Sequence, residues 1–317
     1  MINQTRIIRN HKNHTASTFK WTVSVIALSL GLLSGCASPP ASTPPDRPIS
    51  SVTPAPKRLP KIGLALGGGA ARGFAHIGVI QVLEEAGIRP ALVTGTSAGS
   101  LVAALYASGK SPTQLQQLAE SMDEATFADW TLPIFSRGML RGEALARYVQ
   151  TTVSGRLIED MNLPLGIVAT DLNSGVGVLF QRGDTATAVR ASSAVPAVFQ
   201  PVRIAGREYV DGGLVSPVPV RYARQMGAEL VIAVDISSAP EANPAGDTLQ
   251  ILMQTFTIMV KSINTLELKD ADMVVRPALN SISSADFGAR RRAIQAGRAA
   301  MLALMPQLKA AIETASK

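Results

Sequence analysis

Ser97 stands at the centre of a pattern that is typical of activated serine nucleophiles. Residues 95–99 read Gly-Thr-Ser-Ala-Gly, which has the form G-x-S-x-G, and they join a short apolar run to an apolar helical pattern. A sharp strand-to-helix turn forces such a serine into a strained backbone conformation and directs its hydroxyl to solvent at the top of a sheet. Because glycine and serine are also common in ordinary turns, the pattern gains its meaning from the rest of the chain.

A glycine-rich loop, residues 67–73, precedes this serine and suits an oxyanion hole. It follows a predicted buried strand at 61–66 and opens a predicted helix at about 74–86. Backbone N–H groups at a helix N-terminus stabilise the negative charge that acyl transfer places on a carbonyl oxygen. A nucleotide-binding loop fits less well, because G-x-G-x-x-G from Gly67 needs a glycine at Arg72 and no G-K-[ST] follows. The residues expected to form the oxyanion hole are Gly67, Gly68, Gly69, Ala70, Ala71, Arg72 and Gly73.

The base that activates the serine is predicted to be a carboxylate. Two of the three histidines lie in the N-terminal 35 residues, and the third, His76, precedes Ser97. A Ser-Asp-His hydrolase of the usual chain order needs a histidine after its acid, so His76 is either a structural residue or an unusual base. Asp211, which ends a predicted strand before two glycines, is favoured over Asp171, which precedes an Asn-Ser-Gly turn. Either carboxylate would need burial to raise its pKa from about 4.

The elements that must position these groups begin with strand, helix, strand, helix. Strands at 61–66 and 91–94 alternate with helices at 74–86 and 98–108. This order predicts a parallel sheet with right-handed crossovers, whose loops open at the carboxyl edge. The glycine loop and Ser97 are therefore expected to lie side by side.

Further elements follow from the same reasoning. Ser111 and Pro112 begin a helix. The other expected elements are a strand pair at 163–171 and 176–181, a short helix within 188–199 that ends near Pro196, a hairpin that turns at 205–206 and ends at Asp211, a strand at 228–235, a helix at 249–268, a strand at 273–276 and a helix at 290–308. The apolar stretch at 127–140 is either ordinary packing, which is favoured, or a lid or acyl-chain wall beside the site; its large side chains are Phe127, Trp130, Leu132, Ile134, Phe135, Met139 and Leu140.

Taken together, the glycine loop, the G-x-S-x-G pattern and the Asp-Gly-Gly sequence at 211–213 resemble the patatin-like phospholipase family, especially its bacterial branch related to neuropathy target esterase. The resemblance covers about residues 61–235. It implies an α/β fold of three layers, with a mostly parallel central sheet, helices on both faces and additional C-terminal helices. It also implies that Ser97 is the nucleophile, Asp211 the base and residues 67–73 the oxyanion hole, with Arg72 helping to place that loop. The implied activity is lipid acyl hydrolysis without a metal or an organic cofactor.

The first 35 residues are predicted to be the cleaved signal of a bacterial lipoprotein. A basic head without acidic residues precedes an apolar core at 21–33, which is shorter than the roughly 20 residues that cross a bilayer. The following Leu-Ser-Gly-Cys resembles a lipobox, in which Cys36 becomes the lipid-modified first residue. Because Cys36 is the single cysteine, disulfides within the chain are excluded. Ala37 favours the outer membrane, facing the periplasm, whereas a plain secretory signal is the alternative.

Residues 36–60 are predicted to be a proline-rich tether, because eight prolines among residues 37–60 leave too little apolar surface to form a core. The predicted organisation continues with a hydrolase domain at 61–236 and a mainly helical C-terminal region packed on it at 237–317. Four of the 30 basic residues and none of the 23 acidic residues lie in the signal, so the net charge falls from +7 to +3. Nucleic acid is therefore a poor candidate partner.

The expected function is that of a membrane-tethered serine lipid acyl hydrolase whose partner is a membrane lipid substrate. The alternatives are a lipid-binding or envelope-scaffolding lipoprotein with little activity, and an acyltransferase that uses the same acyl-enzyme. Arg290, Arg291 and Arg292 either attract anionic head groups or form a solvated helix face, which is favoured. The sequence does not determine the lipid head group, the acyl position or the oligomeric state.

Overall fold

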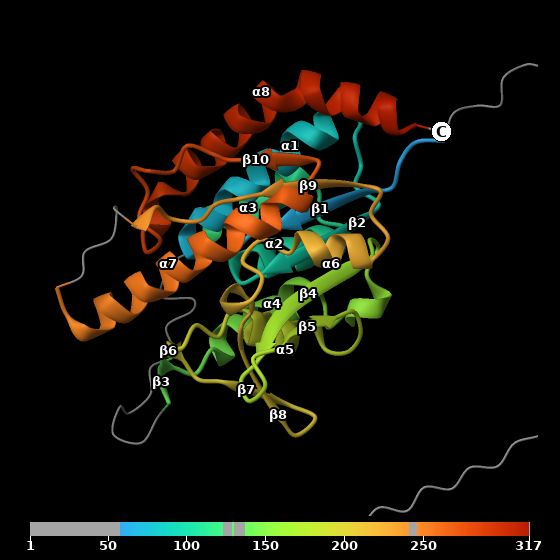
Figure 1. The fold of residues 1–317 in the computed structure, drawn as a ribbon. Helices are drawn as coiled ribbons and strands as arrows, with labels where there is room; N and C mark the ends of the chain where they lie inside the picture. Colours follow the sequence, from blue (N-terminus) through green and yellow to red (C-terminus); the bar gives the residue numbers. More distant parts are fainter. Residues whose placement is uncertain (1–57, 123–128, 130–136, 241–245, 317) are drawn as a thin grey trace, which may run out of the picture. The chain divides into compact units, whose positions relative to one another are not determined.

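An eight-stranded, mostly parallel sheet lies at the centre of the computed structural model, which describes residues 58–122, 129, 137–240 and 246–316 (Figure 1). The strand order is β10 (Met273–Val275), β9 (Leu230–Val234), β1 (Ile62–Leu66), β2 (Leu92–Thr96), β4 (Leu165–Asp171), β8 (Arg207–Asp211) and β7 (Val202–Ile204), and β5 (Gly177–Phe180) pairs with β4. The strands from β10 to β4 are parallel, and β5, β8 and β7 are antiparallel to their neighbours. A separate two-stranded sheet joins β3 (Gly138–Leu140) to β6 (Ala197–Phe199).

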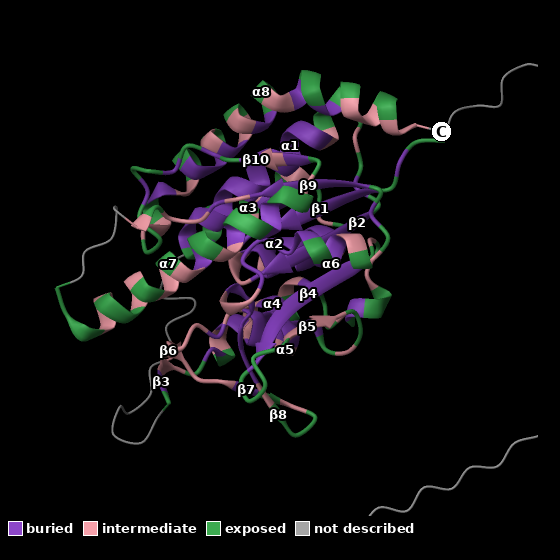
Figure 2. Ribbon diagram, in the orientation of Figure 1, coloured by how far each residue is buried: buried purple, intermediate pink, exposed green. Residues whose placement is uncertain are grey.

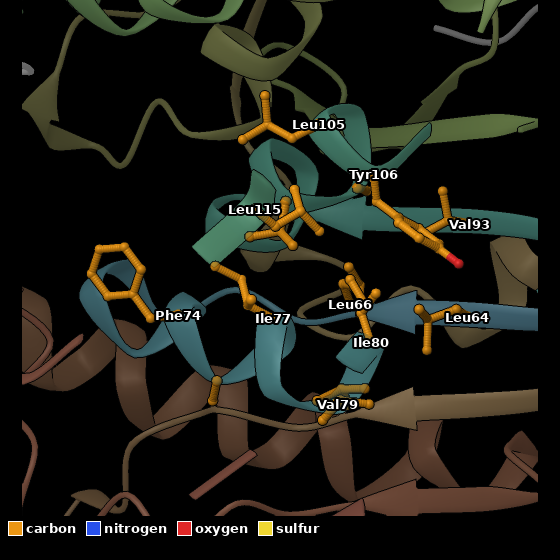
Figure 3. Close-up of a cluster of buried hydrophobic side chains, with 14 of the residues drawn as sticks. Leu64, Leu66, Phe74, Ile77, Val79, Ile80, Val93, Leu105, Tyr106 and Leu115 are labelled. Carbon is orange, nitrogen blue, oxygen red and sulfur yellow. The ribbon is translucent and has the colours of Figure 1, made fainter. Parts of the chain in front are cut away.

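Helices cover both faces of this sheet, which gives the expected three-layer α/β fold. Their bounds are α1 (Ala75–Glu85), α2 (Ala98–Ala107), α3 (Pro112–Ser121), α4 (Glu143–Thr152), α5 (Thr185–Ser192), α6 (Val220–Gln225), α7 (Thr248–Glu267) and α8 (Arg290–Ala315). One apolar core joins alternate residues of the strands, such as Leu64 and Leu66, to α1, α2 and α8 (Figure 3). The intervening residues, such as Ala65, face α6 on the other side. This alternation follows from the two-residue period of a strand buried on both faces.

The C-terminal elements belong to the same architecture. β10 pairs in parallel with β9, so it extends the central sheet by one strand. α8 packs closely along α1, where Gly297 lies so near the Ala75 carbonyl that a Cβ would come within 2.0 Å of its oxygen. The sheet and one of its helical layers therefore include residues well beyond 236.

One expected element differs from the structure. The small-residue stretch at 188–199 does not form a helix that ends near Pro196; α5 begins at Thr185, with the Asp184 side chain as its cap, and ends at Ser192. Residues 197–199 then form β6. The reason is local, since Pro196 disfavours a helical conformation for Val195, and the β-branched and aromatic residues Val198 and Phe199 favour extended backbone.

The register of β4 determines how the site is assembled. β5 pairs with residues 167–170 of β4, while β2 pairs with 165–168 and β8 with 169–171. Because β5 shares partners with both other strands, β2 and β8 must lie in succession along the opposite edge of β4. They run in opposite directions, so their C-terminal ends meet. A Cβ at Gly212 would lie 3.1 Å from Cγ2 of Thr96, which confirms this meeting.

Candidate active site

Ser97 occupies the sharp turn between β2 and α2. Its backbone has φ 53° and ψ −125°, a strained conformation for a residue with a side chain. The flanking glycines are required sterically: a Cβ at Gly99 would come within 2.1 Å of the Leu66 carbonyl oxygen, and one at Gly95 within 2.4 Å of the Gly99 oxygen. The Ser97 amide donates to Ser192 Oγ at 2.9 Å, which fixes the turn against α5. The half-buried Ser97 side chain lines a pocket.

The glycine loop lies against Ser97, as expected from the parallel sheet. A Cβ at Gly68 would be 3.1 Å from Cβ of Ser97, so any larger residue there would crowd the nucleophile. Four loop amides are used for structure: those of Gly67, Gly68, Ala71 and Arg72 donate to the carbonyl groups of Val234, Pro217, Ser284 and Gly69. Within the described residues, the amides of Gly69 and Ala70 make no such bond. Ala70, whose φ is 49°, lines the same pocket as Ser97, so these two amides are the loop donors free to meet an anion.

The Arg72 side chain points into the protein. It is 5% exposed, and Nη1 donates to Ser238 Oγ in the segment after β9. Burial lowers its pKa, and the charge of Asp235 opposes that shift. Arg72 therefore ties the glycine loop to the neighbouring strand end, and it does not line the pocket.

Asp211 ends β8 and is 1% exposed. Its Oδ1 accepts the Gly213 amide at 2.7 Å, while Oδ2 has no hydrogen bond of normal geometry among the described residues. Burial raises its pKa to about 6, and the nearby Ser97 hydroxyl and the Gly213 amide oppose this shift. The result is a carboxylate at the serine that holds a proton far more readily than a solvated aspartate.

Asp171, the rival candidate, has both oxygens occupied. Oδ1 accepts the amides of Asn173 and Ser174 at 3.1 and 2.9 Å, and Oδ2 pairs with Arg207 at 3.0 Å. These bonds, first of all that from the Ser174 amide, lower its pKa. Asp171 thus has the arrangement of a turn-forming residue.

His76 is fully buried beneath the glycine loop. Its Nε2 lies 2.8 Å from the Gly67 carbonyl oxygen, and burial lowers its pKa to about 4. The ring is therefore neutral at pH 7 and, with Nε2 as the donor, holds the start of the loop. This contact supports the structural interpretation of His76.

The pocket beside Ser97 has a volume of about 380 Å³ and an almost entirely apolar wall. Its lining comes from the loop, α1, α2 and α3, the segment that leads to β6, and β3; representative residues are Phe74, Leu105, Leu115, Leu118, Met122 and Val198. Several of these side chains belong to the core cluster of Figure 3, so the pocket is an indentation of the core. Such a cavity accepts an apolar chain with its polar end at Ser97.

Part of the 127–140 stretch lines this pocket. Met139 and Leu140 do so, which favours the acyl-wall interpretation for these two residues. Phe127, Trp130, Leu132, Ile134 and Phe135 lie outside the described residues.

Sequence reasoning did not identify the lining residues of α3 or the residues around Ser193 as part of the site. Leu115, Leu118 and Met122 recur at helical spacing, but this periodicity equally describes packing against a core.

Comparison with known proteins assigns the chain to a family. The profile of the patatin-like phospholipases matches residues 64–224. An uncharacterized NTE family protein of Mycobacterium bovis is 38% identical over 209 residues, covering 65% of this chain and 58% of the relative. The mouse patatin-like phospholipase domain-containing protein 6 is 31% identical over 261 residues, covering 72% of this chain and 19% of that protein. The chain thus matches only part of the length of these relatives.

Among solved structures, VipD from Legionella pneumophila is similar, with a TM-score of 0.57 and 16% identity. The similarity covers 78% of this chain and 67% of VipD. At this level of identity it supports the fold alone.

Proposed function

The chain belongs to the patatin-like phospholipase family, and from this premise we propose that it is a lipid acyl hydrolase of the phospholipase or lysophospholipase type, with Ser97 as nucleophile and Asp211 as base. The observation that carries the proposal is the meeting of a strained Ser97, at an apolar pocket, with a buried carboxylate of raised pKa. A pure binding protein has no need of this combination.

In the proposed first step, Ser97 Oγ attacks the carbonyl carbon of a lipid ester while Asp211 accepts the hydroxyl proton. The amides of Gly69 and Ala70 stabilise the oxyanion, because they are preorganised donors beside the serine. The tetrahedral intermediate collapses, the bond to the alcohol oxygen breaks, and the proton on Asp211 passes to the leaving alcohol. Ser97 then carries the acyl group as an ester, with its chain in the apolar pocket.

In the second step, Asp211 takes a proton from water, and the resulting hydroxide attacks the acyl-enzyme. The fatty acid leaves, and Ser97 Oγ recovers its proton from Asp211. A raised pKa suits a group that accepts and returns a proton near neutral pH.

The cellular setting belongs to the same proposal. Lipidation of Cys36 and the proline-rich tether would hold the enzyme at a bacterial membrane, with the outer membrane's periplasmic face favoured by Ala37. A globular hydrolase on a tether would meet lipid substrates without spanning the bilayer.

A fluorophosphonate probe tests the proposal, since it reacts with activated serines. We expect the full chain to be labelled, labelling to vanish in Ser97→Ala, and labelling to fall sharply in Asp211→Asn. Ser193→Ala and Asp171→Asn are matched controls, because Ser193 lines the same pocket and Asp171 is the other strand-end aspartate. Both controls should keep their labelling.

Two outcomes would contradict the proposal. Undiminished labelling of Ser97→Ala would exclude this serine as the nucleophile. A folded wild type that takes no label and binds lipid without cleaving it would favour the scaffolding lipoprotein. Chromatography of the products separates hydrolysis, which releases free fatty acid, from transfer to another acceptor.

A further inference from the structure

The first twelve residues of α7, Thr248–Met259, form an apolar helical segment that the rest of the described protein covers only in part. Seven of the twelve are large apolar residues, namely Leu249, Ile251, Leu252, Met253, Phe256, Ile258 and Met259. None of the twelve is buried, and the buried residues of α7 begin at Val260. Figure 2 shows the contrast, since the buried colouring of α7 is confined to the half that lies on the body of the protein.

This segment, which we call the α7 arm, lies next to the candidate site. The ring of Phe256 lies so near Gly213 that a Cβ there would come within 3.0 Å of it, and Gly213 donates its amide to Asp211. The side chain of Gln254 donates to the Pro240 carbonyl at 2.7 Å, which anchors the arm to the segment after β9. In Figure 1 the arm extends from the side of the sheet at which the parallel strands end.

The charges on the α7 arm and on the first turn of α8 match an anionic lipid surface. The α7 arm contains no ionisable side chain, so its exposed face can enter an apolar layer without desolvating a charge. The first turn of α8 has three arginines, of which Arg291 and Arg292 face Glu120 and Asp286 at 3.4 and 3.3 Å. The Arg290 guanidinium donates to the Phe287 and Glu120 carbonyl oxygens, both at 2.7 Å. The three guanidinium groups and the two carboxylates therefore sum to one positive charge next to the helix N-terminus. Phe287 lines the pocket and accepts a hydrogen bond from Arg290 at its carbonyl oxygen, so Arg290 lies beside a wall residue of the pocket.

We propose that the α7 arm inserts into the head-group and acyl boundary of an anionic phospholipid bilayer, with Arg290, Arg291 and Arg292 on its lipid head groups. Ile251, Leu252 and Ile258, which are 53%, 49% and 54% exposed, enter the membrane. No helix among the described residues is long and apolar enough to span a bilayer. A helical segment of twelve residues rises only about 18 Å, so the proposed place of the arm is the interface. The proposal rests on the proposed function, because docking would bring the pocket to its lipid substrate.

A local fluorophore tests the insertion without any need for catalysis. In a full chain with Ser97→Ala and Cys36→Ser, a single cysteine replaces Leu252 or, as a control of equal exposure on α8, Leu302. Each is labelled with an environment-sensitive dye and mixed with vesicles of phosphatidylethanolamine containing a quarter phosphatidylglycerol. Emission should shift to the blue at position 252 and stay unchanged at 302, even if the N-terminal apolar segment also binds the vesicles.

Three results would overturn the proposal: no shift at 252, an equal shift at both positions, or a shift at 252 without vesicles that grows with protein concentration. The last result would show that a second copy of the chain covers the arm.

Activity separates this proposal from the proposed function. Ile251→Ser/Leu252→Ser/Ile258→Ser should cleave vesicle lipids at least about tenfold more slowly while keeping its rate on a water-soluble short-chain ester. The control Leu157→Ser/Val176→Ser/Leu302→Ser, which removes exposed apolar residues elsewhere, should keep both rates. Equal vesicle rates for the two triple variants would overturn the docking surface, whereas an inactive wild type on the soluble ester would count against the hydrolase instead.

Discussion

Asp171 and Asp211 end paired strands, lie two register positions apart and are both almost fully buried, yet the protein gives them opposite pKa shifts. Asp171 has two amides and a guanidinium on its oxygens and a lowered pKa. Asp211 has one amide, an oxygen without a normal hydrogen bond, and a pKa raised to about 6. The two shifts differ in direction because desolvation outweighs the hydrogen bonds at Asp211, whereas the hydrogen bonds outweigh desolvation at Asp171.

The largest expected difference between the two aspartates is in activity. Asp211→Asn removes the proposed base and should lower kcat/KM by about 10³-fold or more, within the range of general-base catalysis. Asp171→Asn keeps the fold of the site and should retain activity within about fivefold. Steady-state hydrolysis of a soluble short-chain ester measures both. Comparable losses in the two variants would contradict the assignment of Asp211.

The pH dependence should follow Asp211 only. A base acts when deprotonated, so kcat/KM should rise about tenfold per pH unit below about 6 and level off above it. Asp171→Asn should show the same profile, because Asp171 already carries its charge throughout this range. Profiles from about pH 3.5 to about pH 8 test this, and a midpoint near 4 would mean that Asp211 is not desolvated in the working enzyme.

The substitution Asp211→Asn, which should lower activity, should raise the stability of the fold. The folded-state pKa of Asp211 lies above its ordinary value of 3.8, so its contribution to stability is present below about pH 4 and is lost as the pH rises through about 6. Asp211→Asn removes this cost and should raise the free energy of unfolding at pH 7 by up to about 3 kcal/mol. Asp171→Asn should lower it, because the amide removes the acceptor for Arg207.

Urea unfolding at pH 4.5 and pH 7 is the measurement for this prediction. The gain from Asp211→Asn should shrink at the lower pH, where the wild-type carboxyl is protonated in the folded state. A destabilised Asp211→Asn at both pH values would show that the carboxylate has a structural role instead.

The smallest expected effect comes from Arg207→Ala. The arginine is 67% exposed, so its ion pair with Asp171 is screened by solvent and contributes little. Activity should be unchanged within about twofold, and the urea midpoint should fall less than in Asp171→Asn, whose two amide bonds are also affected. A loss of activity as large as that of Asp211→Asn would link Asp171 to the chemistry after all.

The local parts of the site were predictable because they depend on local rules. The turn at Ser97 and the glycine loop are set by glycines whose missing Cβ atoms allow close approach, and the sequence contains those glycines. The helix at Ser111 follows from its capping residues, and the structure has the complete capping box there. The fold class predicted from the alternation of strands and helices is confirmed.

Other features depend on contacts between distant segments. The helix predicted within 188–199 was wrong at its C-terminal end, where β6 instead pairs with β3, almost sixty residues earlier. The apolar pattern at 249–268 predicted a helix, which is confirmed as α7, but the pattern did not show that the first half of this helix contains no buried residue. A pattern of apolar residues predicts a helix with an apolar face, but it does not show which part of the protein, if any, covers that face.

The sequence by itself determined the fold class, the position of Ser97, the neighbouring glycine loop and the absence of a histidine after the serine, because residue types and short spacings specify these. It left two aspartates as candidates. Tertiary structure gave the two aspartates different environments. β5 occupies one edge of β4, so β2 and β8 share the other edge and bring Ser97 and Asp211 together. The same packing gives Asp171 three donors and leaves Oδ2 of Asp211 without a hydrogen bond of normal geometry in the described part of the chain, and only the assembled sheet fixes that difference.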